Sequence, residues 1–356
     1  MNNSLNKKGP AVSRDVASLD QSARATLRKA LLVCGALSII LIFVVIVAAT
    51  LGSERIPVVD SLRALFTGGA DSGVLTATQL SILFEIRLPR ILLAATVGAS
   101  LAAAGASYQA LLRNALAEPY LLGISNGAAV GTMVALVFFG ANEWTRPVMA
   151  FAGALGATFV VYRLARGRAG ASPERLILAG VIVTTFQSSL IVFITTLMDA
   201  TRIRSFTFWL LGDLSQAASG SLWIATVATI VGVTGLTLKA RPLNLLMLGE
   251  RDAFDLGVEV ERVRLQVFLA ASLLVGVSVA LSGSVGYVGL VVPHLVRMST
   301  SGDNRVTIPA AALAGASFVV IADTLARTVI APRELPVGAI TALVGAPLFI
   351  YLLKRR

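Results

Sequence analysis

The chain contains a single cysteine, Cys34, and a single histidine, His294, among its 356 residues. One cysteine cannot form an intrachain disulfide, so cysteine usage does not indicate a redox compartment. The sequence also lacks a cluster of His, Cys, Asp and Glu at metal-ligand spacing, a Ser-His-Asp set and a phosphate-binding loop of the GxxxxGK[ST] type. These absences disfavour a metal site or catalysis in this chain.

Charge is also scarce, since only 14% of the residues are charged while 56% are hydrophobic. The mean hydropathy is +0.82. A soluble domain of this size with that composition would expose a very large apolar surface. The sequence therefore predicts an all-α, polytopic membrane protein.

Ten apolar runs are long enough to cross a bilayer as helices. They cover residues 31–51, 91–112, 120–141, 147–165, 176–198, 221–238, 265–283, 284–300, 309–330 and 336–353. The eighth is short and contains Gly286, Gly289 and Pro293. Such an interrupted segment is tolerated only where neighbouring protein or a water-filled cavity satisfies the freed backbone groups.

Residues 1–30 are polar and basic and have no apolar face, which predicts a disordered tail before a transmembrane domain over 31–356. An even number of spans places both termini on one side of the membrane. Most lysines and arginines fall in loops on that side, so we expect cytoplasmic termini and a multi-pass protein of the cell membrane. Orientation against anionic lipid accounts for the net charge of +11 without nucleic acid binding.

Small residues form stripes within the spans, at 97–107 and 313–320, and they predict close helix packing. The segments 98–105 and 276–283 agree at four of eight positions. Because the second would run opposite to the first, this similarity favours an inverted repeat of helices two to five on helices seven to ten, with a pathway between the halves.

The loop at 239–264 is long and amphipathic, with an apolar group that includes Leu243 and Leu246. It predicts two short helices lying on the membrane face, with a turn at Gly249 and a stop at Gly257. The loop is either a plain surface segment or a docking surface for a cytoplasmic partner.

Charged residues near the opposite, outer face form two groups. Arg87 and Arg90 stand at the mouth of the second span, where they either anchor the helix at the interface or capture an acidic partner. Asp323 and Arg327 are spaced i, i+4 and predict a local ion pair. A site for a coupling ion would need more charge, which disfavours an ion-coupled secondary transporter.

Several long motifs together resemble the permease subunit of type II ABC importers for iron chelates, haem and cobalamin. They are RLPR (87–90), GASYQALLRNALAEPYLLGISNGAAVG (105–131), RPLNLLMLGERDAFDLGV (241–258), VGVSVALSGSVGYVGLVVPHLVR (275–297) and IADTLARTVIAPRELPVGAITALVGAP (321–347). The resemblance runs from about residue 31 to the C-terminus and leaves the tail outside.

The resemblance implies a homodimer of ten-helix subunits with the pathway along its two-fold axis. It also implies two cytoplasmic ABC ATPase subunits, which hold the ATP and magnesium, and a periplasmic or lipid-anchored substrate-binding protein outside. The permease would then perform no bond chemistry and hold no cofactor or metal, because ATP binding would move it between outward-open and inward-open states.

The resemblance also suggests roles for particular residues. Docking of the binding protein is expected at Arg87, Arg90 and Arg327. Coupling to the ATPase is expected at Leu246, Gly249, Glu250 and Gly257. The cytoplasmic gate falls between helices four and five, at Ser172, Pro173 and Glu174, where family members use small hydroxyl residues. Gln109, Ser125 and Asn126 are candidates for lining the pathway.

The resemblance favours an iron chelate, either a ferric siderophore or haem, as the expected cargo, because iron chelates are the commonest cargo of the family. Cobalamin is the alternative, since several motifs resemble its permease equally well. The position of His294 at the cytoplasmic face argues against strong haem ligation inside the pathway but does not prevent haem from passing. The rival from another class is an ion-coupled secondary transporter, which would have no use for a coupling loop.

Overall fold

The computed structural model of the chain describes residues 9–52, 54, 56–67, 75–139, 144–167, 170–215, 219–300 and 302–354. Over these residues the protein is almost entirely helical, which confirms the predicted all-α class. The strands in the described part are β1 (Arg166–Gly167) and β2 (Gly170–Ala171), which pair antiparallel between two helices.

Every predicted span contains a helix. The helices are α1 (Gly9–Thr50), α4 (Leu88–Leu111), α5 (Ile124–Val134) with its π-helical continuation η3 (Ala135–Phe139), α6 (Thr145–Ala165), α7 (Pro173–Thr195), α9 (Ser219–Leu238), α12 (Val260–Ser282), α13 (Val288–Thr300), α14 (Asn304–Thr328) and α15 (Val337–Lys354). Within the described residues, seven helices are long and apolar enough to cross a membrane, and α5 with η3 and α15 are shorter apolar helices. The count of ten spans is therefore approximate.

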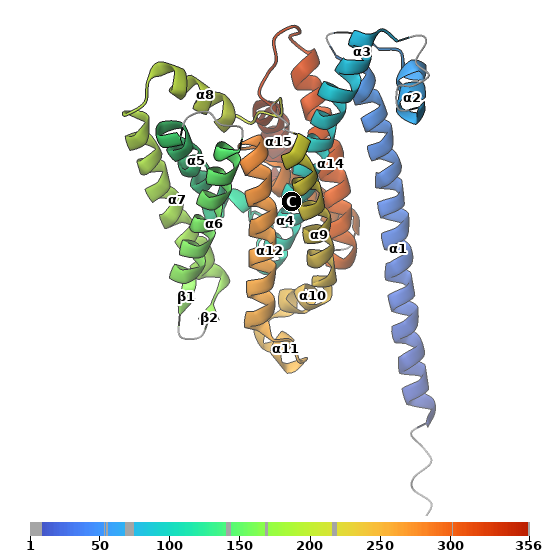
Figure 1. Cartoon of the computed structure of the whole chain (residues 1–356). Helices are drawn as coiled ribbons and strands as arrows, with labels where there is room; N and C mark the ends of the chain where they lie inside the picture. Colours follow the sequence, from blue (N-terminus) through green and yellow to red (C-terminus); the bar gives the residue numbers. More distant parts are fainter. Residues whose placement is uncertain are drawn as a thin grey trace, which may run out of the picture.

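Short elements gather at the two ends of the bundle (Figure 1). One end, here called the α8 end, carries α2 (Val58–Thr67), α3 (Ala77–Ser81) and α8 (Ala200–Leu210). The other, here called the α11 end, carries α10 (Ala240–Leu248), α11 (Glu250–Asp255) and the strand pair. A π-helix, η1 (Ile82–Arg87), leads into α4, and a 3-10 helix, η2 (Pro119–Leu122), precedes α5.

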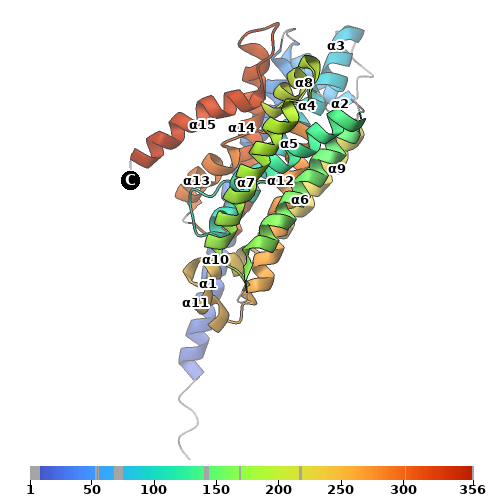
Figure 2. The ribbon, with the colours of Figure 1, turned by 90° about the vertical axis from the view of Figure 1, so that its left-hand side faces the viewer.

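The first helix is longer than the sequence suggests. α1 begins at Gly9, inside the predicted tail, and extends beyond the bundle past α11 (Figures 1 and 2). Residues 9–30 thus belong to the described helix α1, residues 1–8 lie outside the described part, and the predicted disorder of the tail stays a prediction.

The buried centre of the bundle is α4, and close backbone contacts hold its neighbours against it. A Cβ added at Gly98 would overlap the backbone of Gly315 in α14, and the reverse substitution would overlap Gly98. Gly105 faces the backbone of Gly289 in α13 in the same way. The predicted role of the small-residue stripes in close packing is thus confirmed for α4 and α14.

Replacing Gly98 with leucine should separate α4 from α14 and lower the free energy of unfolding by about 3 kcal/mol, because the new side chain meets backbone rather than a movable side chain. A matched control is Gly156→Leu, since a Cβ at Gly156 meets nothing within 4 Å. Thermal unfolding of both variants in detergent measures the difference. Equal stability of the two would contradict the close packing of α4 against α14.

Candidate functional site

The three arginines predicted to dock a binding protein lie towards the α8 end, but their side chains are buried. Arg90 Nε donates to Asp323 Oδ1 at 2.9 Å, and Arg327 Nε lies 3.1 Å from Asp323 Oδ2. The second contact confirms the predicted i, i+4 pair. Sequence reasoning missed the first, because Arg90 and Asp323 are 233 residues apart and no periodicity connects them.

Arg87 and Arg327 both donate to carbonyls at the end of α1. Arg87 Nη1 lies 2.9 Å from the Ala49 oxygen, and its Nη2 donates to the Glu54 carbonyl. Arg327 Nη2 reaches the Ala48 oxygen at 3.3 Å. Because cations satisfy the unpaired carbonyls at a helix C-terminus, these two side chains fix α1 to the bundle. The guanidiniums of Arg87, Arg90 and Arg327 are thus buried and bound within the chain, and a docking role for them stays a prediction.

One carboxylate of this cluster remains partly accessible. Arg90 Nη1 lies 2.7 Å from Glu334 Oε2, and the Glu334 side chain is 50% exposed, in contrast with 1% for Asp323. Glu334 lies in the loop between α14 and α15, which the sequence analysis did not single out. Its side chain thus joins the buried Arg90 guanidinium to the exposed surface.

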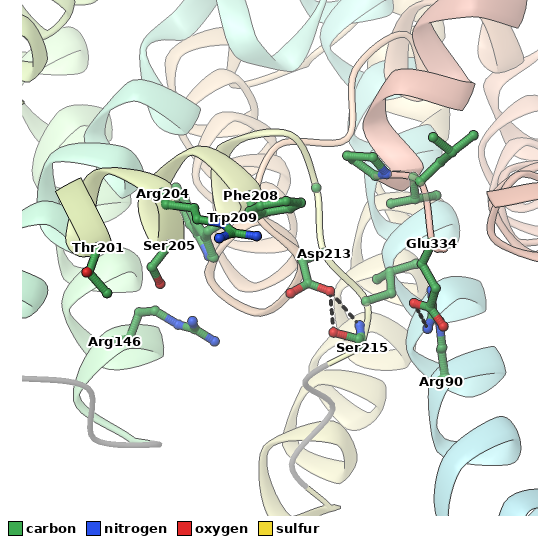
Figure 3. A pocket seen from close by; sticks show the side chains of 15 residues that line it. Arg90, Arg146, Thr201, Arg204, Ser205, Phe208, Trp209, Asp213, Ser215 and Glu334 are labelled. Carbon is green, nitrogen blue, oxygen red and sulfur yellow. Dashed lines mark hydrogen bonds and ion pairs between the residues drawn. The ribbon is translucent and has the colours of Figure 1, made fainter. Parts of the chain in front are cut away.

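A cavity of about 420 Å³ adjoins this pair (Figure 3). Arg146 from the start of α6 and Arg204 from α8 line one side, and Arg90 and Glu334 line the other. Asp213 lies between them and accepts hydrogen bonds from the backbone nitrogen and hydroxyl of Ser215 at 2.8 and 2.6 Å. The lining residues come from four separate segments, so the sequence pattern alone gives no signal of the cavity.

At the α11 end, the predicted amphipathic loop forms two short helices, α10 and α11, as expected. Gly249 separates them with a φ of 158°, and Gly257 follows α11 with a φ of 83°. The left-handed conformation of Gly257 is typical of a helix C-terminus and favours glycine there. The turn and the stop that the sequence predicts are both confirmed.

The exposed face of these helices differs from the expected one. Leu246 is buried against the bundle, so its side chain is not accessible for the predicted contact with the ATPase. Leu248, Phe254 and Leu256 are exposed instead, Phe254 by 71%. Three exposed apolar side chains close together at the end of a membrane protein indicate a contact surface. Sequence reasoning did not single out these three residues, because the loop contains further apolar residues such as Leu243 and Leu246.

Glu250 connects this surface to the bundle. Its Oε1 lies 3.0 Å from Arg113 Nη2, just beyond α4, and 2.6 Å from Arg264 Nη2 in α12. The Arg264 side chain is only 4% exposed and also pairs with Glu261 at 2.5 Å. Glu261 in turn accepts from the backbone nitrogen of Ala171 in β2 at 3.4 Å. Ion pairs and a hydrogen bond therefore connect α11 to the segment after α4, to α12 and, through Glu261, to the strand pair.

The residues predicted for the gate begin α7. The Ser172 hydroxyl accepts from the backbone nitrogen of Arg175 at 3.4 Å, Pro173 occupies the first helical turn and Glu174 follows it. This is the usual chemistry of a helix N-terminus. The structure assigns these residues a capping role, and a gate at this position stays a prediction.

Two of the three candidate pathway residues are buried, and the third, Asn126, is partly buried. Gln109 is buried and donates to the Leu290 carbonyl at 3.1 Å, and Ser125 is also buried. Asn126 makes no cap and instead donates to Ser188 Oγ at 2.9 Å, which connects α5 to α7. Contact of these side chains with cargo stays a prediction.

The backbone between α12 and α13 is not helical, and two side chains satisfy it. The Tyr120 hydroxyl accepts from the Val285 nitrogen at 2.9 Å and donates to the Val285 oxygen at 3.0 Å. Glu118 Oε1 accepts from the Tyr287 nitrogen at 3.2 Å, and burial raises the pKa of this carboxyl group. The predicted interruption of the eighth span is thus placed before Val288, where neighbouring protein provides the hydrogen bonds.

The known proteins that this chain resembles are components of transport systems. The FecCD transport family matches residues 40–355. The hemin transport system permease protein HmuU of Yersinia pestis is 39% identical over 91% of this chain and 96% of its own length. The vitamin B12 import permease BtuC of Vibrio cholerae is 40% identical over 79% of this chain and 85% of its own.

Similarity extends to solved structures. One described as an inward-facing conformation of a metal-chelate type ABC transporter has a TM-score of 0.80 and 29% identity, covering 91% of this chain and 99% of the other. Coverage of nearly the whole length by family, relatives and structure shows that the resemblance concerns the entire bundle rather than one motif.

Proposed function

Because the chain belongs to the FecCD transport family and is the permease subunit of an ABC importer, we propose that it carries an iron chelate, a ferric siderophore or haem, from a binding protein into the cytoplasm. The observation that carries this proposal is the match to a hemin permease over nearly the full length of both chains. Similarity to the metal-chelate type transporter structure supports the same cargo class.

The working assembly we propose is a homodimer with two ATPase subunits at the α11 end and the binding protein at the α8 end. The N- and C-termini then lie in the cytoplasm, and ATP and magnesium are held by the ATPases. Exposed apolar residues on α15, including Leu343, Val344 and Ile350, suit contact with a second copy, since α15 diverges from the bundle (Figure 2).

The proposed mechanism begins at the α11 end of the bundle. ATP binding draws the ATPases together and moves α10 and α11, and the Glu250–Arg264 contact transmits that movement to α12. The permease then alternates between states open to either side, driven by the difference in ATPase affinity for those states. This chain contributes the pathway and its coupling, while hydrolysis belongs to the partner.

Cobalamin is the second candidate, because vitamin B12 permeases of four organisms are 40–42% identical to this chain. The cargo is tested by reconstituting the permease with its ATPase and binding protein in lipid vesicles. We expect ATP-dependent uptake of hemin or a ferric siderophore that excess cyanocobalamin does not inhibit. Uptake of cyanocobalamin alone would assign the alternative cargo instead.

A further inference from the structure

An apolar groove lies along three helices that are long and apolar enough to cross a membrane. α12 lies between α6 and α9 (Figure 1), and the groove that these helices form has a volume of about 690 Å³. Among its described lining residues, Ser221 is the only one with a hydroxyl or charged side chain. Ile224 and Val231 also line the groove and are exposed. A surface of this composition favours contact with hydrocarbon rather than with water.

The groove has a length that suits a lipid chain. Its lining on α9 extends from Ser221 to Gly235. Those fourteen residue steps correspond to about 21 Å at the helical rise, whereas one leaflet contributes about 15 Å to the hydrocarbon core of a bilayer. A Cβ at Gly235 would meet nothing within 4 Å, so the groove is open at this position. One acyl chain from a single leaflet therefore fits along the groove.

Basic side chains stand at the α11 end of the groove. Lys239 follows Gly235 by four residues, and its backbone nitrogen donates to the Gly235 oxygen at 3.3 Å, so it lies one helical turn further on the same face. Arg163, in the last turn of α6, is exposed at the same end of the bundle. Neither side chain has an ion pair within the described residues. Basic groups beside an apolar groove at the end of membrane spans are typical of sites for anionic lipid headgroups.

A second copy of this chain is the other candidate occupant of the groove. The proposed contact between copies uses α15, which lies on the opposite side of the bundle from α9 (Figure 2). Trp144 and Trp223 are exposed near the α8 ends of α6 and α9, and exposed tryptophans are typical of the boundary between lipid and water. These observations favour lipid as the occupant.

We propose that the groove binds an anionic phospholipid of the cytoplasmic leaflet, with one acyl chain along α9 and α12 and the headgroup phosphate at Lys239 and Arg163. The inference rests on the proposed function for its orientation, which places the α11 end in the cytoplasm. Lys239 joins α9 to α10, the first of the two short helices of the amphipathic loop. A bound headgroup therefore holds the start of α10 at the membrane surface.

The headgroup is tested by native mass spectrometry of the complete permease–ATPase complex in detergent, titrated with phosphatidylglycerol or phosphatidylcholine of the same acyl chains. We expect the wild type to bind phosphatidylglycerol roughly fivefold more tightly, and Lys239→Gln to lose most of that preference. Arg241→Gln is the matched control, because Arg241 is an exposed cation on α10 that does not line the groove. Equal affinity of the wild type for the two lipids, or an equal loss in both variants, would overturn the headgroup site.

The acyl chain is tested by filling the groove. Gly235→Leu should weaken binding of both lipids roughly tenfold, because the leucine side chain occupies the space of the chain. Gly156→Leu on α6 is the control, since a Cβ at Gly156 also meets nothing within 4 Å but Gly156 does not line the groove. Unchanged lipid affinity in Gly235→Leu would overturn the proposal. Separation of the permease copies by Gly235→Leu would assign the groove to a contact between copies and would also defeat it.

These lipid titrations require neither cargo nor binding protein, so they separate this inference from the proposed function. Absence of ATP-driven uptake of any chelate would contradict the proposed function and leave the measured lipid affinities unchanged. If uptake is normal and the Lys239 and Gly235 variants match their controls, only the lipid site fails.

Discussion

Replacing Asp323 with alanine is expected to destabilise the protein by about 3–5 kcal/mol, far more than the loss of an exposed ion pair would. Asp323 is 1% exposed and contacts Arg90 and Arg327, which are themselves buried. Removal of the carboxylate leaves the two buried guanidiniums without the acidic partner that they share. Thermal unfolding in detergent, together with the yield of monodisperse protein, measures this loss.

A control and a rescue make the prediction specific. Glu334→Gln removes a half-exposed carboxylate from the same cluster and should cost less than about 1 kcal/mol, because exposed ion pairs contribute little. Combining Asp323→Leu with Arg90→Met and Arg327→Met should restore most of the stability, since all three buried charges of these two ion pairs are then replaced by apolar side chains. If Asp323→Ala is as stable as Glu334→Gln, the buried cluster does not hold α4 and α14 together.

Replacing Phe254 with aspartate is expected to reduce ATP-driven uptake roughly tenfold or more while the permease stays folded. Phe254 is 71% exposed on α11, so its change affects a contact surface rather than the core. Large aromatic side chains at the centre of an interface contribute most of its binding free energy. Uptake, co-purification of the ATPase and its stimulated hydrolysis are the measurements.

Val59→Asp provides the comparison for this variant. Val59 is 72% exposed on α2, at the opposite end of the bundle, so the same charge is introduced away from the proposed ATPase contact. We expect normal ATPase association in Val59→Asp. Full association and uptake in Phe254→Asp would remove α11 from the coupling surface.

Much of the fold could be predicted because membrane helices are recognisable by their length and apolar content. The turn at Gly249 and the end of α11 near Gly257 could also be predicted, because each depends on residues only a few positions away in the sequence. The Gly98–Gly315 contact was predictable only as a tendency of small residues to pack closely, without its register. In this chain, the local sequence thus determines which segments form helices.

The candidate sites were less predictable because they depend on which side of a helix faces the bundle. Arg90 resembles a surface charge in sequence, yet α14 brings Asp323 against it and buries both. Leu246 and Phe254 are both apolar residues of one amphipathic loop, but only Phe254 faces outward. The 420 Å³ cavity combines four segments that lie between residues 90 and 337, so only the folded chain reveals it.

The energy source for transport is tested most directly by uptake of radiolabelled iron into vesicles that contain the complete complex. The iron is supplied as hemin or a ferric siderophore. ATP and an imposed proton or sodium gradient are supplied separately. We expect uptake with ATP and none with a gradient alone, and we expect Phe254→Asp to reduce the ATP-driven component roughly tenfold or more. Uptake driven by a gradient without ATP would contradict the assignment of this chain as an ABC importer permease.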